Sequence, residues 1–354
     1  MKIFTIVGAR PQFIKASVVS RAIADQEGLS EKIVHTGQHF DANMSDIFFD
    51  QLGIPRPDFQ LDIHGGTHGE MTGRMLIEIE HLMIQERPDR VLVYGDTNST
   101  LAGALAASKL HIPVAHIEAG LRSFNMRMPE EVNRILTDQI SDILFCPTHA
   151  AVNNLLTDGF DKKPVKIVNS GDVMQDSAVF FSRRASKPLG LDVNDGYVLA
   201  TLHRAENTDD PQRLASIVEA LNFIHLTVAP IVLPIHPRTR AKIEDAGLVL
   251  HVKQIEPVGY LEMIWLLQHC CLVLTDSGGV QKEAFFFSKP CVTMRDQTEW
   301  VELVEAGANV LCGAETSSII NAVARSINSV VKDDAELYGG GRAAPFIADY
   351  LANA

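Results

Sequence analysis

The sequence predicts an α/β fold in which two domains, each built on a parallel sheet, follow one another along the chain. Short apolar, β-branched runs alternate with helical runs, as where Val91–Tyr94 and Val114–Ile117 flank the Ala- and Leu-rich Thr100–Leu110. Such runs are typical of strands that are covered on both faces of a sheet. The alternation pauses over residues 185–195, which mix Pro, Gly and Asp, and then restarts. A chain of 354 residues is also long enough for two cores.

The first half contains six expected strands and the helices between them. The strands are Lys2–Val7, Ile33–Thr36, Val91–Tyr94, Val114–Ile117, Ile143–Cys146 and Val165–Ile167. Besides the helical run already named, helices are expected from Ile14 to Ile23, after the Gly-rich His64–Met75, and from Pro129. Proline is favoured at the first position of a helix. This order predicts a parallel, doubly wound domain.

The second half repeats the same pattern. Strand-like runs lie at residues 197–203, 230–236, 248–255, 271–279, 290–294 and 309–313, and most of them are followed by a helical run. The segment 185–195 is interpreted as a connection between the halves. The tail, YGGGRAAPFIADYLANA, breaks at three glycines and resumes as a helix.

The composition argues against several classes of partner and site. The formal charge of −13 argues against nucleic acid, because binding to its backbone requires clustered Lys and Arg. The five cysteines show no metal-ligand spacing, so we expect buried thiols in a reducing compartment and no metal. The N-terminal apolar run is too short for a signal peptide, and Gln268 and His269 interrupt the longest apolar stretch. A cytoplasmic protein without a membrane partner is therefore expected.

Three carboxylates lie where a strand should give way to a loop or to the start of a helix. Asp96 follows Val91–Tyr94, Glu118 follows Val114–Ile117, and Glu130 follows Pro129. Since ligands bind beyond the carboxyl ends of parallel strands, Asp96 and Glu118 should line one crevice suited to moving protons. The residues after Asp96 can simply cap a helix, and Glu130 and Glu131 can simply complement a helix dipole. Glu118 has no such structural role, and a carboxylate at a strand end requires a partner.

The motif DSGGVQKEA follows a strand in the second half and opens a helix. Gly278 and Gly279 expose backbone N–H groups at the positive end of that helix, which favours a diphosphate, and Ser277 can add a hydroxyl donor. Glu283 lies about two turns into that helix, where its side chain can reach the ribose hydroxyls of a bound nucleotide. The alternative interpretation is a tight turn that uses glycine for steric reasons.

Basic residues follow three other expected strands. His203 and Arg204 lie in TLHRAEN, and His236 lies in LPIHPRTR, so each motif places a His at a strand end. Such a His can bind a phosphate or protonate a leaving group. Arg10 and Lys15 lie in the first strand-to-helix connection, GARPQFIK, where Arg can grip phosphate oxygens and Lys supplies a point charge. The alternative in each case is an ordinary solvated cation.

Together these segments resemble the non-hydrolysing UDP-N-acetylglucosamine 2-epimerase family over essentially the whole chain. The motifs that carry the resemblance are GARPQFIK, TGQH, GDTNST, HIEAGLRS, PEEVNR, DSGGVQKEA, KPCVTMRDQTE and the YGGG tail. The resemblance implies the GT-B fold, with two Rossmann-like domains facing across a cleft. Residues 1–170 and a returning C-terminal helix, 343–354, would form the first domain, and residues 171–342 the second, UDP-binding domain.

The resemblance also implies a reaction and its residues. Family members eliminate UDP by anti elimination, form a glycal-like intermediate, and add UDP back with the opposite configuration at carbon 2, without a cofactor. The implied acid–base and catalytic residues are Asp96, Glu118, Glu130 and His203. The implied nucleotide- and phosphate-binding residues are Arg10, Lys15, Ser277, Gly278, Gly279 and Glu283. Arg134, in PEEVNR, is implied to orient the carboxylates, and a homodimer is implied as the assembly.

Two departures from the commonest family pattern indicate the sugar. After MRDQTE most members continue with Arg-Pro-Glu, whereas this chain has Trp300, Val301 and Glu302. Arg127 also lies three residues before Glu130. These features resemble the subgroup that acts on UDP-2,3-diacetamido-2,3-dideoxy-glucuronic acid and makes its manno epimer for surface polysaccharide (O-antigen). Our hypothesis is that Arg127 binds the extra carboxylate of that sugar, and the alternative is that Arg127 faces solvent.

Other functions share some of these features. One is a UDP-N-acetylglucosamine 2-epimerase that makes UDP-N-acetylmannosamine. Another is a GT-B glycosyltransferase, which would share the UDP-binding corner but would not explain three carboxylates in the first domain. A silent nucleotide-sugar sensor would be expected to lack at least one of those carboxylates, and a hydrolysing epimerase would release free sugar.

Overall fold

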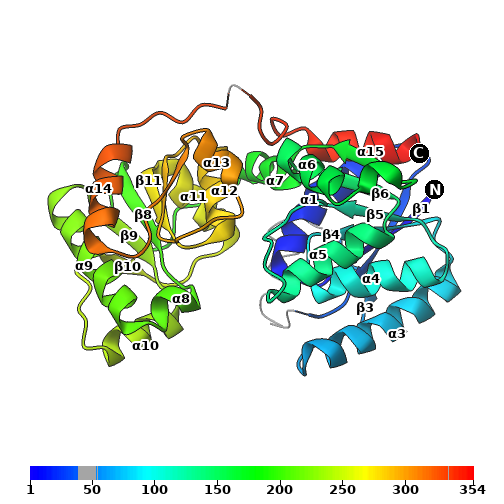
Figure 1. The fold of residues 1–354 in the computed structure, drawn as a ribbon, viewed down its shortest axis with the longest axis horizontal. Coiled ribbons are helices and arrows are strands. Elements are labelled where there is room, and N and C mark those ends of the chain that lie inside the picture. The colour runs from blue at the N-terminus through cyan, green and yellow to red at the C-terminus, as the bar shows by residue number, and fades with distance from the viewer. Residues whose placement is uncertain (39–52, 54, 334) are drawn as a thin grey trace. The chain divides into compact units, whose positions relative to one another are not determined.

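The computed structural model describes residues 1–38, 53, 55–333 and 335–354 and divides the chain into two compact α/β units (Figure 1). Unit 1 contains Met1–Ser177 and Glu336–Ala354, and unit 2 contains Ala178–Ala335. Each unit is built on one parallel sheet, which confirms the predicted fold class. The first division falls within a helix at Ser177, whereas the sequence placed it at residue 170. Ser177 Oγ donates to the carbonyl of Ile14, which ties this helical turn to unit 1.

Unit 1 is a seven-stranded sheet in the order β3-β2-β1-β4-β5-β6-β7. Its strands are β1 (Lys2–Val7), β2 (Ser30–His35), β3 (Phe59–Gln60), β4 (Arg90–Tyr94), β5 (Val114–Ile117), β6 (Ile143–Cys146) and β7 (Lys166–Asn169). Three of these strands, β1, β5 and β6, have the bounds that the sequence predicts. The central strands are buried on both faces, which is why their sequences are continuously apolar.

The helices of unit 1 cover both faces of this sheet. They are α1 (Arg10–Ala24), α3 (His68–Glu86), α4 (Asn98–Lys109), α5 (Pro129–Ile140), α6 (His149–Thr157), the first half of α7 (Val173–Ser182) and α15 (Ala343–Ala352). Met75 and Ile79 of α3 pack with Phe4 and Val91 on one face. On the other face α15 packs along α1, and Tyr350 contacts Phe145 edge to face at 5.5 Å. The return of the C-terminal helix to the first unit is therefore confirmed.

Unit 2 is a six-stranded sheet in the order β10-β9-β8-β11-β12-β13. Its strands are β8 (Tyr197–Thr201), β9 (Ile231–Pro234), β10 (Lys253–Ile255), β11 (Cys270–Thr275), β12 (Cys291–Thr293) and β13 (Asn309–Leu311). Its helices are α8 (Ala205–Thr208), α9 (Pro211–Thr227), α10 (Pro237–Asp245), α11 (Tyr260–His269), α12 (Gly278–Phe286), α13 (Val301–Glu305) and α14 (Thr316–Ser326). Residues of α9 and α14 pack on one face of the sheet, and residues of α11 and α12 on the other.

Two expectations for unit 2 are wrong in detail. The strand-like run at residues 248–255 pairs only over Lys253–Ile255, because the Asn222 side chain hydrogen-bonds the carbonyl of Val249 and the N–H of His251. The segment 185–195 is irregular but belongs to unit 2, where Leu191 is buried with the core. Among the described residues, no helix is both long and apolar enough to cross a membrane.

Candidate active site

One group of candidate residues lies in unit 1, where the strand order reverses between β1 and β4. Gln12 fixes this corner of the sheet. Its Oε1 accepts from the N–H groups of Gly8 and Ala9 at 2.8 and 3.0 Å, and its Nε2 donates to the Tyr94 carbonyl at 2.8 Å. Gln12 therefore joins the loop after β1, which leads to Arg10 at the start of α1, to the end of β4. The sequence analysis missed this buried residue, although it lies within the GARPQFIK motif.

Asp96 follows β4 and binds a cation. Its Oδ2 lies 2.6 Å from Arg134 Nη2, and Arg134 Nη1 lies 2.8 Å from Glu131 Oε2. Burial raises the pKa of the Asp96 carboxyl despite the opposing charge of Arg134, and the charge of Glu118 adds to the increase. The structure therefore brings Asp96, Glu118 and Arg134 together, as the sequence predicts for these three residues. A carboxyl with a raised pKa is suited to general acid–base chemistry.

Glu118 has the partner that its position requires. Its carboxylate forms an ion pair with Lys15 Nζ of α1, and both side chains are about nine-tenths buried. Glu118 has φ of 72°, a left-handed conformation that is uncommon for a residue with a side chain and that concentrates at functional sites. Gly95 makes room for the pair, since a Cβ on Gly95 would lie 3.1 Å from Glu118 Oε2 and 3.5 Å from Lys15 Nζ.

Glu131, which the sequence analysis considered only as a dipole partner, is fully buried and holds a loop. Its two oxygens accept from the N–H groups of Ser123 and Phe124, each at 2.9 Å. Burial raises the pKa of Glu131, but these hydrogen bonds and Arg134 outweigh it, so the pKa is lower than usual. The neighbouring Glu130 is exposed on the first turn of α5.

A buried network supports the loops that carry these carboxylates. His116 Nε2 bonds the Gly95 carbonyl at 2.7 Å, and His116 Nδ1 lies 2.8 Å from Asp138 Oδ1. Asp138 also binds Arg122 Nη1 at 2.7 Å and the N–H of Gly120 at 3.3 Å. His116 and Gly120, which flank Glu118, are thereby tied to Gly95, the residue before Asp96.

Arg127 and the TGQH motif lie in different settings. Arg127 is exposed in the loop before α5, and its N–H donates to Asn125 Oδ1 at 3.2 Å. Gln38 Oε1 accepts from the N–H and the hydroxyl of Ser99 at 3.0 and 2.7 Å. His39, the last residue of TGQH, lies outside the described residues.

A second group of candidate residues lies in unit 2, where the strand order reverses between β8 and β11. Asp276, fully buried at the end of β11, joins the two strand ends. Its carboxylate accepts from the N–H groups of His203 and Arg204, at 3.0 and 2.9 Å to Oδ2, and lies 3.4 Å from His203 Nδ1. The sequence analysis quoted Asp276 in its motif but gave it no role. Half of the His203 side chain is exposed, so Asp276 orients an accessible imidazole.

The glycine corner, Ser277–Gly279, begins α12 as predicted. The Ser277 side chain makes no cap hydrogen bond, so its hydroxyl is not used by the helix. Trp300 Nε1 donates to the carbonyl of Gly278 at 2.9 Å, and the Lys282 ammonium lies 4.2 Å from the centre of the Trp300 ring. Glu283 is partly buried in the same helix.

His236 lies at the N-terminus of α10, where its Nδ1 accepts from the N–H of Arg238 at 3.2 Å. This contact is a helix cap, which is the structural interpretation of that residue, and a binding role for His236 stays a prediction. Among the described residues, no cluster of His, Cys, Asp and Glu has the arrangement of a metal site.

Comparisons with known proteins agree with this geometry. A sequence model of the family described as UDP-N-acetylglucosamine 2-epimerase matches residues 21–352. The chain is 73% identical over 352 residues to the UDP-2,3-diacetamido-2,3-dideoxy-D-glucuronate 2-epimerase of Pseudomonas aeruginosa, covering 99% of each chain. It is 46% identical over 342 residues to the UDP-N-acetylglucosamine 2-epimerase of Methanocaldococcus jannaschii, covering 93% of each.

Two solved structures share the fold over 100% of each chain. One is the crystal structure of the M. jannaschii UDP-GlcNAc 2-epimerase in complex with UDP-GlcNAc and UDP, with a TM-score of 0.88 and 45% identity. The other is the UDP-GlcNAc 2-epimerase of Neisseria meningitidis bound to UDP-GlcNAc, with a TM-score of 0.88 and 30% identity.

Proposed function

This chain belongs to the UDP-N-acetylglucosamine 2-epimerase family and is therefore an isomerase, and we propose that it inverts carbon 2 of UDP-2,3-diacetamido-2,3-dideoxy-D-glucuronate. The observation that carries this proposal is the 73% identity over 99% of both chains with the P. aeruginosa enzyme that bears this name. The ion-paired carboxylates of unit 1 and the glycine corner of unit 2 supply the chemistry that the reaction requires.

In the proposed reaction the bond between carbon 1 and the UDP oxygen breaks, the proton on carbon 2 is removed, and UDP then adds back as a proton returns to the opposite face. Asp96 and Glu118 exchange these protons, and their negative charge stabilises the oxocarbenium-like centre. Unit 2 binds the UDP, whose negative charge is stabilised by the N–H groups of the glycine corner and by His203. Carbon 1 regains UDP and carbon 2 regains a proton, so no external reactant is consumed.

Proton NMR in deuterium oxide tests the reaction directly. The chain is incubated with UDP-2,3-diacetamido-2,3-dideoxy-D-glucuronate and, separately, with UDP-N-acetylglucosamine. We expect the carbon-2 proton signal to disappear and the manno epimer to form without any acceptor. Retention of the carbon-2 proton, with UDP released only when an acceptor is added, would indicate a glycosyltransferase, and release of free sugar would indicate a hydrolysing epimerase.

UDP-N-acetylglucosamine is the second candidate substrate, because the M. jannaschii relative that is 46% identical carries that name. Arg127 is exposed next to α5 and is the residue that we expect to bind the sugar carboxylate. Arg127→Ala should raise KM for the glucuronate about tenfold or more and leave KM for UDP-N-acetylglucosamine within about twofold. Arg127→Lys, which keeps the charge, should retain part of the preference, and equal losses on both substrates would refute this role.

We further propose a cytoplasmic homodimer that serves surface polysaccharide synthesis. All five cysteines are free thiols, which suits a reducing compartment.

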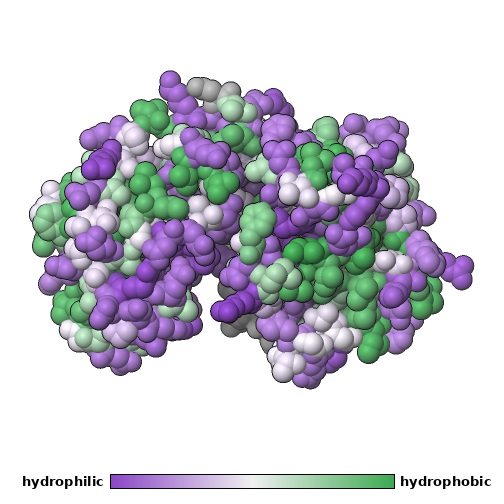
Figure 2. All heavy atoms as spheres, viewed as in Figure 1, coloured by the Kyte–Doolittle hydropathy of each residue, from purple (hydrophilic) through white to green (hydrophobic). Residues whose placement is uncertain are grey.

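The proposed dimer would use an apolar surface of unit 1. Ile77 and Ile84 of α3 and Leu136 of α5 are exposed, and Figure 2 shows hydrophobic residues gathered over the face of unit 1 where α3, α4 and α5 lie. Apolar patches of this kind support association. Sedimentation at several concentrations should show a dimer, and Leu136→Asp should weaken it. The role in polysaccharide synthesis follows from the family resemblance.

A further inference from the structure

A carboxylate of the chain itself lies at the glycine corner of unit 2. Glu299 Oε1 lies 2.2 Å from the place that a Cβ on Gly278 would take, so the carboxylate lies directly against the first residue of the helix. Gly278 is the first residue of α12, a helix of nine residues. Its exposed N–H groups and positive dipole end attract an anion, and in this structure Glu299 supplies the negative charge next to them.

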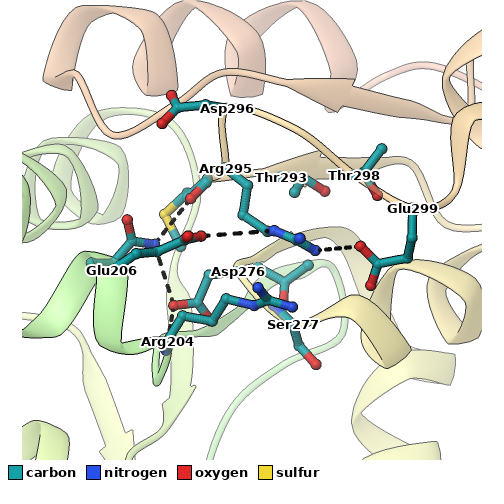
Figure 3. A network of polar contacts seen from close by, with 12 residues as sticks. Arg204, Glu206, Asp276, Ser277, Thr293, Arg295, Asp296, Thr298 and Glu299 are labelled. Atoms are coloured by element: carbon teal, nitrogen blue, oxygen red, sulfur yellow. Dashed lines mark hydrogen bonds and ion pairs between the residues drawn. The ribbon is translucent and has the colours of Figure 1, made fainter. Parts of the chain in front are cut away.

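Two arginines converge on the same place (Figure 3). Arg295 Nη1 lies 2.9 Å from Glu299 Oε2, and Arg204 Nη2 lies 3.9 Å from the Cβ position of Gly278. Arg295 is 7% exposed. Its Nε has no hydrogen-bond partner among the described residues and lies 3.8 Å from Glu206 Oε1. Arg295 therefore contacts two carboxylates, and Glu299 is the one of the two that also reaches Gly278.

The segment that carries Glu299 is anchored on both sides. Thr298 Oγ1 donates to Gln281 Oε1 at 2.7 Å, and Trp300 binds the carbonyl of Gly278. Thr298 and Trp300 therefore fix the backbone against α12, while Glu299 between them is only partly buried. The position of Glu299 follows from these anchors, and its side chain can rotate away without disturbing them.

We propose that the Glu299 carboxylate and the diphosphate of UDP compete for the same place at the glycine corner, and that Arg295 is the guanidinium that binds whichever anion is there. This inference rests on the proposed function, since it requires UDP at α12. Glu299 and a phosphate share the chemistry that the corner recognises, a compact anion with oxygens spaced for bidentate contact with Arg. Glu299 thus lowers the affinity for UDP and keeps Arg295 paired until the nucleotide binds.

Glu299→Gln tests the competition, because it removes the charge and keeps the size of the side chain. Isothermal titration with UDP, and with inorganic pyrophosphate as a second probe, should show each binding about tenfold more tightly than to the unchanged chain, which is about 1.4 kcal/mol. The matched control is Glu305→Gln, which removes the same charge from an exposed residue of α13 and should leave both affinities within about twofold.

Two more variants separate competition from a structural role. Glu299→Asp keeps the charge but shortens its reach toward Gly278, so its UDP affinity should lie between those of the unchanged chain and Glu299→Gln. In the Glu299→Gln background, Arg295→Lys should weaken UDP binding about tenfold, because lysine supplies a point charge in place of a bidentate fork.

The inference is overturned if Glu299→Gln binds UDP as the control does or more weakly, or if Arg295→Lys in that background leaves the UDP affinity unchanged. Thermal unfolding of each variant shows whether the fold is retained. The proposed function fails in a different way, through the absence of carbon-2 exchange or of any UDP binding by the unchanged chain.

Discussion

Asp96 shows how one side chain can be both bound and chemically available. Arg134 holds its carboxylate at 2.6 Å, yet burial keeps its pKa above the ordinary value. The folded chain therefore holds the Asp96 proton more tightly than the unfolded chain does. Ionised Asp96 thus opposes folding, as expected of a group retained for chemistry rather than for stability.

Asp96→Asn should lower kcat roughly 10²- to 10⁴-fold, because a general acid–base group is removed. The same substitution should stabilise the fold at neutral pH, although it lowers activity, because it removes a buried ionised group. A raised pKa contributes stability that is present below the unfolded value and lost as pH rises through the folded value. The melting temperature of Asp96→Asn relative to the unchanged chain should therefore increase as the pH rises above about 4.

The control for this variant is Asp142→Asn, which breaks another Asp–Arg pair of unit 1, Arg90 to Asp142 at 2.7 Å. It should keep carbon-2 exchange within about twofold of the unchanged chain. If Asp96→Asn retained most of its exchange activity, Asp96 would not be an acid–base residue.

At the scale of a single element, the loop between β5 and α5 is held by a side chain of the helix that follows it. Glu131 binds the N–H groups of Ser123 and Phe124, while Phe124 is 79% exposed with φ of 56°. A strained, exposed aromatic residue persists only where its surroundings hold it. The loop that presents Arg127 therefore depends on one buried carboxylate.

Glu131→Gln should destabilise the chain by about 1–3 kcal/mol at neutral pH, since an amide replaces a carboxylate that accepts from two backbone donors and Arg134. The lowered pKa of Glu131 means that its contribution is present above the unfolded value and lost as pH falls through the folded value. The deficit measured in urea should hence stay constant down to about pH 4.5 and shrink as the pH falls further. Glu130→Gln, one residue earlier and exposed, should stay within about 0.5 kcal/mol. Equal deficits for both variants would contradict this role.

Helix α12 depends on Trp300 for the placement of its first turn. Trp300→Phe keeps an aromatic ring but removes the donor to the Gly278 carbonyl. We expect KM for the UDP-sugar to rise about threefold to tenfold with a smaller change in kcat, because the corner binds nucleotide and does not exchange protons. Trp265→Phe, at the only other tryptophan of the chain, should leave KM unchanged. If Trp300→Phe had the same KM as the unchanged chain and as Trp265→Phe, the hydrogen bond to Gly278 would be dispensable.

The sequence predicted the central elements well and the supporting contacts poorly. Strands such as β5 are predictable because a continuous apolar run bounded by polar residues has few other conformations. The run at residues 248–255 failed because Asn222, distant in sequence, takes up its backbone groups. Gln12, Glu131 and Asp276 were missed for a related reason: a buried polar residue looks ordinary until its partners are known.

At the scale of the whole chain, the last helix completes the first unit. Ile347 and Leu351 of α15 are fully buried, and Asp176 accepts from the N–H groups of Ala343 and Ala344 at 3.1 and 2.8 Å. Burial of one such aliphatic side chain contributes about 1.5–3 kcal/mol. The chain therefore completes the core of unit 1 only with its final residues.

Deleting residues 343–354 should expose α1 and leave the interior of unit 2 intact. Hydrogen exchange read by mass spectrometry should show lost protection over α1 and unchanged protection over α9. UDP should still slow exchange at α12, because binding stabilises the unit that binds. Deletion of residues 353–354 alone, beyond the helix, is the control. Lost protection at α9 as well would contradict the assignment of α15 to unit 1 alone.

The thiols of the chain have a practical consequence. Cys146, Cys270 and Cys291 are buried, Cys271 and Cys312 are half-buried, and burial raises the pKa of all five. Thiolates are the reactive species, so maleimide dyes near neutral pH should label these native positions slowly. One surface cysteine engineered into each unit could then carry a donor and an acceptor fluorophore, and single-molecule energy transfer could follow the two units through a catalytic cycle without removing any native cysteine.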